Sequence, residues 1–166
     1  MGPRLTGALA LAAALVLALP ASGAAPRNRE FAPGKNLGGV RLGMTKGAVL
    51  AAWGKEHGVC RKCPRETWYF NYRPFHPEGV GVVFDRGRVV HVFTIWRPAG
   101  WRTLEGVFLG APASDVSRVY GSLDQRHCTF YDALLQPGER SQSVFYVFRD
   151  RVWGFGLTEP DASPCL

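Results

Sequence analysis

The sequence predicts an α+β fold in which two tandem α-β-β-β repeats form an antiparallel sheet with both helices packed on one face. Three observations lead to this prediction. A 17-residue segment occurs twice, each copy is followed by runs rich in β-branched and aromatic residues, and Gly, Pro or Asp residues bound those runs. Two units of about 60 residues indicate a duplication rather than a solenoid.

The repeated segment reads GGVRLGMTKGAVLAAWG, ending at Gly54, and EGVFLGAPASDVSRVYG, ending at Gly121. Its second half has apolar residues at spacing i, i+3, i+4, which is the stripe of a short amphipathic helix. Thr45 is suited to cap the first helix, and Pro112 is suited to begin the second. Because helices this short do not persist alone in water, we expect both to dock on a sheet.

Each helix is followed by three predicted strands. In the first copy they are TWYFNY and two runs within VGVVFDRGRVVHVFTIWRP, and in the second HCTFYDALL and two runs within SVFYVFRDRVWGFGLTEP. Asp85-Arg86-Gly87 and Arg149-Asp150 are short enough to be hairpin turns. We therefore assign repeat 1 to residues 39–96 and repeat 2 to residues 106–160, each a helix plus three strands.

The remaining segments are a leader, a tail, a connector and a C-terminal end. Residues 1–24 have the layout of a secretory signal peptide, with Arg4, an apolar run and a small-residue exit. The alternative is a membrane anchor, for which the run is short. We expect a flexible N-terminal tail at 25–38, a connector at 97–105 and a C-terminal tail with Cys165 at 161–166. The mature chain is expected to be secreted or otherwise extracytoplasmic, with no membrane span.

All four cysteines follow the predicted cleavage site, and an even number in an exported chain predicts two disulfides, with three possible pairings. Cys60 and Cys128 occupy equivalent loops of the two copies, so we expect Cys60–Cys63 and Cys128–Cys165. The C-x-x-C formed by Cys60 and Cys63 leaves open a thiol-redox function, or a metal site with His57. We favour the structural disulfide and expect no metal and no other cofactor.

Charge and motifs narrow the function classes. The formal net charge is +7, and the cations are mainly arginines. Such a surface suits anionic polymers or an acidic partner, but it also serves solubility alone, and an exported chain is not expected to bind nucleic acid. The sequence has no G-x-S-x-G or S-x-x-K motif, no close carboxylate pair and no phosphate-binding loop. We therefore expect a protein that is not an enzyme.

The motif V-R-L-G-M-T-x-x-x-V-x-x-x-x-G from Val40, followed by V-x-F-x-x-G-x-V from Val82, resembles the SmpA/OmlA-type (BamE-like) module. A tandem pair of such modules resembles the β-lactamase-inhibitor-protein (BLIP) fold, and the resemblance covers residues 37–160. The second copy departs from the pattern at Ala111-Pro112-Ala113. The resemblance implies proteins that bind other proteins or belong to envelope assemblies, and it supplies no catalytic residues.

A sheet with helices on one face leaves its other face solvated or available for binding. Alternation places Trp68, Phe70 and Tyr72 on one side, and it groups Trp153 with Phe155 and Leu157. Aromatic rings rimmed by arginines have the composition of protein-binding hot spots. We therefore predict a non-catalytic exported binding protein that holds a protein or cell-envelope component on its open aromatic sheet face and hairpin tips. The predicted contact residues are Trp68, Tyr72, Trp101, Trp153, Arg97 and Arg102.

Overall fold

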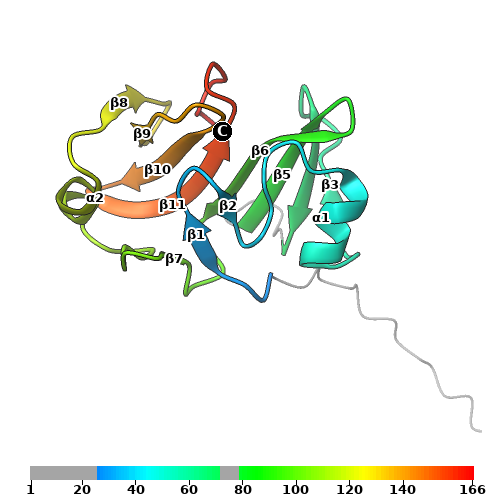
Figure 1. Ribbon diagram of the computed structural model, residues 1–166, viewed down its shortest axis with the longest axis horizontal. Coiled ribbons are helices and arrows are strands. Elements are labelled where there is room, and N and C mark those ends of the chain that lie inside the picture. Colours follow the sequence, from blue (N-terminus) through cyan, green and yellow to red (C-terminus); the bar gives the residue numbers. More distant parts are fainter. Residues whose placement is uncertain (1–25, 72–78) are drawn as a thin grey trace, which may run out of the picture.

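The computed structural model describes residues 26–71 and 79–166. Its centre is one antiparallel sheet with the strand order β3-β4-β5-β6-β11-β10-β9-β8 (Figure 1). The first repeat supplies β3 (Gly58–Val59), β4 (Glu66–Phe70), β5 (Gly79–Asp85) and β6 (Arg88–Ile95). The second repeat supplies β8 (Asp124–His127), β9 (Asp132–Gln136), β10 (Gln142–Phe148) and β11 (Arg151–Thr158).

The two repeats are joined through β6 and β11, which pair from Gly154 opposite Ile95 to Thr158 opposite His91. The predicted α+β class is confirmed. Each repeat has one strand more than expected, because β3 and β8 form short outer edges of the sheet. The hairpin turns at Arg86-Gly87 and Arg149-Asp150 are where the sequence placed them, each between two paired strands.

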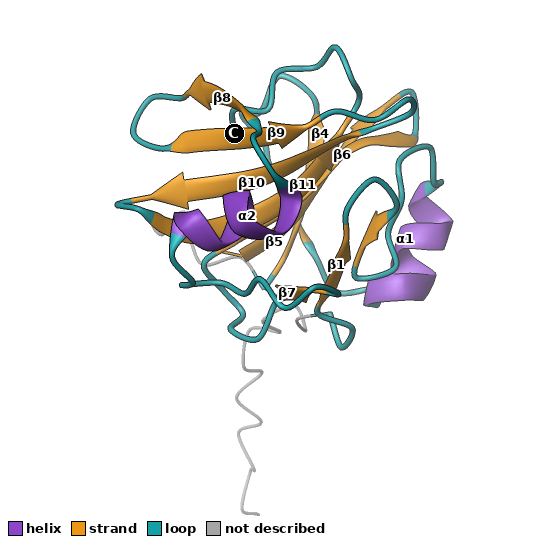
Figure 2. Cartoon of the chain, turned by 60° about the vertical axis from the view of Figure 1, so that its left-hand side comes forward, coloured by secondary structure: helices purple, strands orange, loops and turns teal. Residues whose placement is uncertain are grey.

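Both helices, α1 (Lys46–Trp53) and α2 (Ala113–Tyr120), pack on the same face of the sheet near its two ends (Figures 1 and 2). The Ala48 N–H donates to the Thr45 hydroxyl, so Thr45 caps α1 as predicted. Pro112 precedes α2 without a side-chain cap. Gly54 and Gly121 end the helices with φ of 95° and 79°, which a residue with a Cβ adopts only with strain.

The repeated V-x-L-G segment fixes each helix to the last strand of its own repeat. The Gly43 N–H donates to the Val89 carbonyl, and the Gly110 N–H donates to the Val152 carbonyl, each at 2.7 Å. The return bonds run from the Val89 N–H to Met44 and from the Val152 N–H to Ala111. Equivalent residues therefore make equivalent contacts in both copies, which is the arrangement that a duplicated unit requires.

The predicted tail and connector form a second, small sheet. β1 (Glu30–Ala32) pairs antiparallel with β2 (Asn36–Leu37) and parallel with β7 (Arg102–Thr103), and the three strands lie between the two helices (Figure 2). Phe31 is fully buried, with its ring centroid 5.2 Å from that of Phe155. Residues 30–37 thus differ from the expected flexible tail, because the groove between the helices gives their apolar side chains a place to be buried.

The face of the sheet away from the helices holds a core of its own, made of Phe93, Ile95, Tyr131, Ala133, Leu135, Val144, Tyr146 and Trp153. A bulge in β11 leaves Trp153 without a partner on β10. As a result Trp153 joins this second core, while Phe155 and Leu157 belong to the helix-side core. The predicted grouping of these three side chains was therefore wrong, since simple alternation does not anticipate a bulge.

The C-terminal segment runs from β11 to the loop between β8 and β9. The Glu159 N–H donates to the Val90 carbonyl, Cys165 forms a disulfide with Cys128, and the Leu166 N–H donates to the Tyr131 hydroxyl. Most rings of the second core are almost fully buried: Trp153 is 9% exposed and Phe93 8%. The expected wide, open aromatic face is therefore reduced to a smaller surface at one end of the sheet.

Candidate binding surface

The structure places the predicted contact residues in different environments. Trp68 is 7% exposed and Trp101 is fully buried, both in the helix-side core. The Trp68 indole N–H donates to Glu66. A partner cannot reach either ring without opening this core, so we correct their assignment from contact residues to core residues. Tyr72 lies outside the described residues.

The other predicted contact residues are accessible or lie near accessible rings. Arg102 is exposed in β7, on the small sheet, and Arg97 is exposed directly after Trp96. Trp153 lies on the face of the sheet away from the helices, here called the second face, beside rings that the sequence did not single out. Of the six predicted residues, Trp153 thus belongs to the surface described next, and Arg97 directly follows another of its residues, Trp96, in sequence.

Four rings form an aromatic patch at the end of the second face: Trp96, Phe130, Phe148 and Trp153. The ring of Trp153 lies 5.8 Å from both Phe130 and Phe148, measured between centroids. Phe130 is 56% exposed and Trp96 47%. Trp153 itself is buried, so its ring lies beneath the exposed neighbours. Large exposed rings over a buried one are typical of a surface that a partner covers.

The aromatic patch is bordered by the turn between β10 and β11. The Arg149 guanidinium lies 5.1 Å from the centre of the Phe148 ring, which is a cation–π distance. Arg149, Arg151 and three rings of the patch line a cavity of about 410 Å³. The Arg151 guanidinium donates to the Gly110 carbonyl, so this side chain also supports the entry to α2. Arg149 is left to combine directional hydrogen bonds with the apolar surface.

Tertiary contacts hold the patch together. The Trp96 N–H donates to the Trp153 carbonyl at 2.7 Å, which continues the β6–β11 pairing by one residue. Phe130 lies in the β8–β9 loop, two residues after Cys128, and the disulfide from Cys128 to Cys165 ties that loop to the C-terminal segment. The sequence analysis included Trp96 and Phe130 in predicted strand runs, but both lie just outside the strands, so the alternation within those runs did not single them out as exposed.

Cys60 and Cys63 form the predicted disulfide, and Cys128 and Cys165 form the other. Disulfides are typical of proteins outside the reducing cytoplasm, which agrees with an extracytoplasmic location. The Cys60–Cys63 pair lies in the loop between β3 and β4, after a strand rather than at the start of a helix. Among the described residues, no group of three or more His, Cys, Asp or Glu side chains is placed to hold a metal ion.

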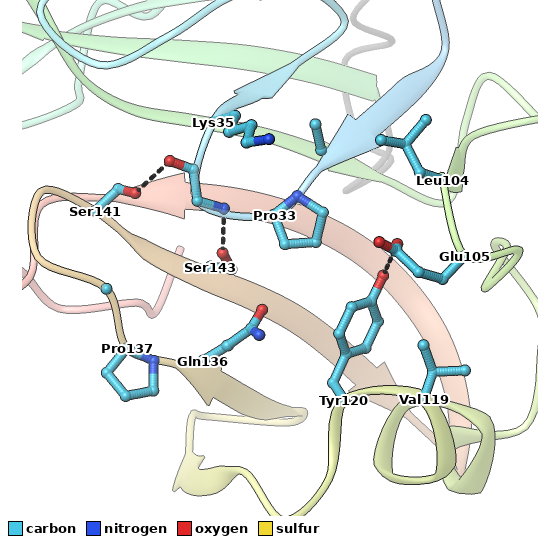
Figure 3. A pocket seen from close by; sticks show the side chains of 13 residues that line it. Pro33, Lys35, Leu104, Glu105, Val119, Tyr120, Gln136, Pro137, Ser141 and Ser143 are labelled. Atoms are coloured by element: carbon cyan, nitrogen blue, oxygen red, sulfur yellow. Dashed lines mark hydrogen bonds between the residues drawn. The ribbon is translucent and has the colours of Figure 1, made fainter.

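A polar cleft of about 410 Å³ lies between the β1–β2 turn and the end of α2 (Figure 3). Tyr120 donates to Glu105, which lowers the pKa of that carboxyl. Burial, together with the same hydrogen bond, raises the pKa of the Tyr120 phenol. Gln136 points into the cleft, and its Oε1 is buried with no hydrogen-bond partner among the described residues. The exposed side chains of Leu104 and Val119 form an apolar rim.

The turn on the other side of this cleft is fixed by two serines. The Gly34 N–H donates to Ser143 at 2.7 Å, and the Ser141 hydroxyl donates to the Gly34 carbonyl at 3.0 Å (Figure 3). Both hydroxyls are therefore engaged by backbone and serve structure. The cleft offers hydrogen bonds and charge for holding a ligand.

None of the described helices is long and apolar enough to cross a membrane.

Comparisons with known proteins give the fold. No family model matches the chain, and no curated protein matches it in sequence. An extracellular protein containing an SCP domain from Bacillus anthracis is similar in structure, with a TM-score of 0.52 and 14% identity over 71% of this chain and 44% of that one. A DUF4309 family protein (YjgB) from Bacillus subtilis has a TM-score of 0.51 and 16% identity over 69% of this chain and 78% of that one.

The chain thus spans less than half of the first of these proteins. At such low identity the likeness shows the fold alone. Neither structure is described as an SmpA/OmlA-type module or a β-lactamase-inhibitor fold.

Proposed function

We propose that this is a non-catalytic exported binding protein that holds a protein or cell-envelope partner on the aromatic patch Trp96, Phe130, Phe148 and Trp153. The observation that carries the proposal is the exposure of Phe130 and Trp96, 56% and 47%, directly around the buried Trp153. Large exposed rings are costly in water, and covering them is favourable by about 25 cal/mol per Å² of apolar surface. Arg149 and Arg97 supply charge at the edge of this surface.

The repeated architecture supports this function. Two copies of one unit join through β6 and β11, and this is the arrangement that a resemblance to tandem SmpA/OmlA-type modules and to the BLIP fold implies. The proposal includes this resemblance, whose members bind proteins or belong to envelope assemblies. The competing thiol-redox or metal-binding function of Cys60 and Cys63 has less support, because their loop lacks the helix start that lowers a thiol pKa.

The test is crosslinking in the envelope and culture-medium fractions of the producing organism, with a photoreactive residue introduced at Arg149. The patch variant carries Trp96→Ser and Phe130→Ser. A matched control carries Leu104→Ser and Phe108→Ser, which removes exposed apolar side chains outside the patch. We expect one dominant crosslinked product whose yield falls at least about tenfold in the patch variant, equivalent to about 1.4 kcal/mol of binding, and stays within about twofold in the control. Equal yields in both variants would refute the proposal.

A further inference from the structure

Three cations line a second cleft, which shares Gly34, Lys35 and Ser141 with the cleft in Figure 3. The cleft has a volume of about 420 Å³. Lys35 comes from the β1–β2 turn, Arg41 from the segment between β2 and α1, and Arg140 from the loop between β9 and β10. None of the described residues that line this cleft is acidic. Residues far apart in the sequence thus bring three positive charges to one concave surface.

Arg41 and Arg140 make no ion pair within the described part of the chain, whereas Lys35 also lines the cleft in Figure 3, where its charge contributes to the lowered pKa of Glu105. No hydrogen bond, ion pair or cation–π contact of the Lys35, Arg41 or Arg140 side chain occurs among the described residues. Other cations of the chain do have partners: Lys46 pairs with Glu66 at 2.6 Å, and Arg118 pairs with Asp115 at 2.7 Å. Three like charges with only one acidic group nearby, Glu105 beside Lys35, still repel one another, and a bound anion reduces that repulsion.

The backbone beneath the cations is held in place. Ser141 and Ser143 fix the turn that carries Lys35, and Ser141 is 6% exposed directly after Arg140. Met44 lies three residues after Arg41 and two before α1, and its carbonyl accepts from the Val89 N–H. Fixed backbone positions reduce the entropy lost when a ligand binds, because only side chains remain to be ordered.

We propose that the cleft of Lys35, Arg41 and Arg140 binds a phosphate group, either free or carried on a larger molecule. A phosphate group carries a charge of about −1.5 to −2 at pH 7 and three acceptor oxygens, which matches three cations better than a single carboxylate does. Arginine presents paired donors in a planar fork that suits phosphate geometry. This site goes beyond the proposed function and is separate from it. The cleft includes residues that come just before β10, whereas Phe148 of the aromatic patch is the last residue of β10, at the other end of the strand.

Titration calorimetry of the full mature chain tests the proposal. The ligands are inorganic phosphate, glucose 6-phosphate and acetate. The cleft variant is Lys35→Gln, Arg41→Gln and Arg140→Gln, and the control variant is Arg61→Gln, Lys62→Gln and Arg126→Gln, which removes the same charge from exposed positions elsewhere. We expect phosphate or its ester to bind with a Kd below about 10 mM, the Kd to rise at least about tenfold in the cleft variant, and the control to change it by less than about twofold.

The outcomes separate the sources and the alternatives. Tighter binding of glucose 6-phosphate than of inorganic phosphate identifies a carried phosphate, and the reverse identifies the free ion. Acetate binding as tightly as phosphate, equal losses in the two triple variants, or no binding of either phosphate ligand would overturn the proposal. The Trp96→Ser, Phe130→Ser variant should bind phosphate unchanged, so failure here and failure of the proposed protein-binding function are distinguishable.

Discussion

Trp53 and Tyr120 are the last residues of their helices and occupy equivalent positions in the two repeats. Each donates a hydrogen bond to the equivalent residue of the segment before its helix, but the acceptor is a backbone atom in one copy and a side-chain atom in the other. The Trp53 indole N–H donates to the backbone carbonyl of Gly38 at 2.8 Å. The Tyr120 hydroxyl donates to the side-chain carboxylate of Glu105, the residue that aligns with Gly38. Trp53 is 4% exposed, whereas Tyr120 is half-buried at the edge of the cleft in Figure 3.

This difference teaches how a duplicated unit diverges. The backbone hydrogen bonds that fix Gly43 to Val89 and Gly110 to Val152 are the same in both copies. The side chains around them changed: one copy closes its helix end with a buried indole, and the other leaves a polar cleft. Conserving the backbone frame keeps the fold, while side chains at the helix end are free to form a surface.

The two copies also differ in the length of the loop that their disulfide closes. Removing the disulfides should give the largest losses of stability. Cys60–Cys63 closes a loop with a sequence separation of 3, and Cys128–Cys165 one with a separation of 37. Loop-closure entropy predicts a loss of about 4 kcal/mol for Cys128→Ala, Cys165→Ala and about 2 kcal/mol for Cys60→Ala, Cys63→Ala. Urea denaturation measures both. Equal losses would show that the C-terminal segment retains its place without the bond.

The thiols provide a control for this comparison. Titration of the folded wild-type protein under non-reducing conditions should detect no reactive thiol, since the described residues contain no free cysteine. A rapidly reacting low-pKa thiol at Cys60 or Cys63 would instead support the redox alternative.

The two central strands, β6 and β11, differ at a buried position: β6 has His91 where the equivalent residue of β11 is Gly154. Burial lowers the pKa of His91 to about 4 from its usual 6.5, and its ring bonds to the Tyr146 hydroxyl, whose pKa burial raises. A histidine with a depressed pKa stabilises the fold fully above the unfolded pKa, and this stability is lost as pH falls from about 6.5 to about 4. The expected loss is about 3 kcal/mol.

Urea denaturation at several pH values between 7 and 4 checks this prediction. His91→Gln should reduce the slope of the free energy of unfolding against pH by about 1.4 kcal/mol per pH unit over that window. The contributions of the other titratable groups should stay unchanged. Parallel stability profiles for the wild type and His91→Gln would contradict it.

The smallest expected effects compare the helix ends themselves. Trp53→Phe leaves the buried Gly38 carbonyl without its donor and removes part of a buried ring, so we expect a loss of about 2 kcal/mol. Tyr120→Phe removes a hydrogen bond at a half-exposed position, so we expect about 0.5–1 kcal/mol. Thermal or urea unfolding measures the difference. A larger loss for Tyr120→Phe would mean that the Tyr120–Glu105 pair is a structural anchor.

Local patterns predicted the parts of the fold that repeat. The apolar triplet ending at Trp53, the aligned triplet ending at Tyr120 and the Arg149-Asp150 turn were all placed correctly, because helix and hairpin formation depend on residues close in sequence. Phe31 and Trp101 were placed on a tail and on a connector, yet both are fully buried. Their burial depends on a groove that exists only once both helices have docked.

The candidate site was predictable in kind but not in position. Sequence composition indicated aromatic rings with arginines, and Trp153 was among the residues chosen. A bulge in strand pairing turns Trp153 away from Phe155. The loop joined to the C-terminal segment by Cys128–Cys165 brings the Phe130 ring within 5.8 Å of the Trp153 ring. Pairs so distant in sequence leave no local signal.

The sequence by itself determined the duplication, the α+β class, the helix and turn positions and the two disulfides, since each of these depends on neighbouring residues or on equivalent positions of the two copies. Only the tertiary structure decided which rings are core and which are surface, and which cations share a cleft. The physical reason is that exposure and charge proximity are set by how the whole chain packs, through contacts between segments up to about a hundred residues apart, such as Gly34 with Ser143.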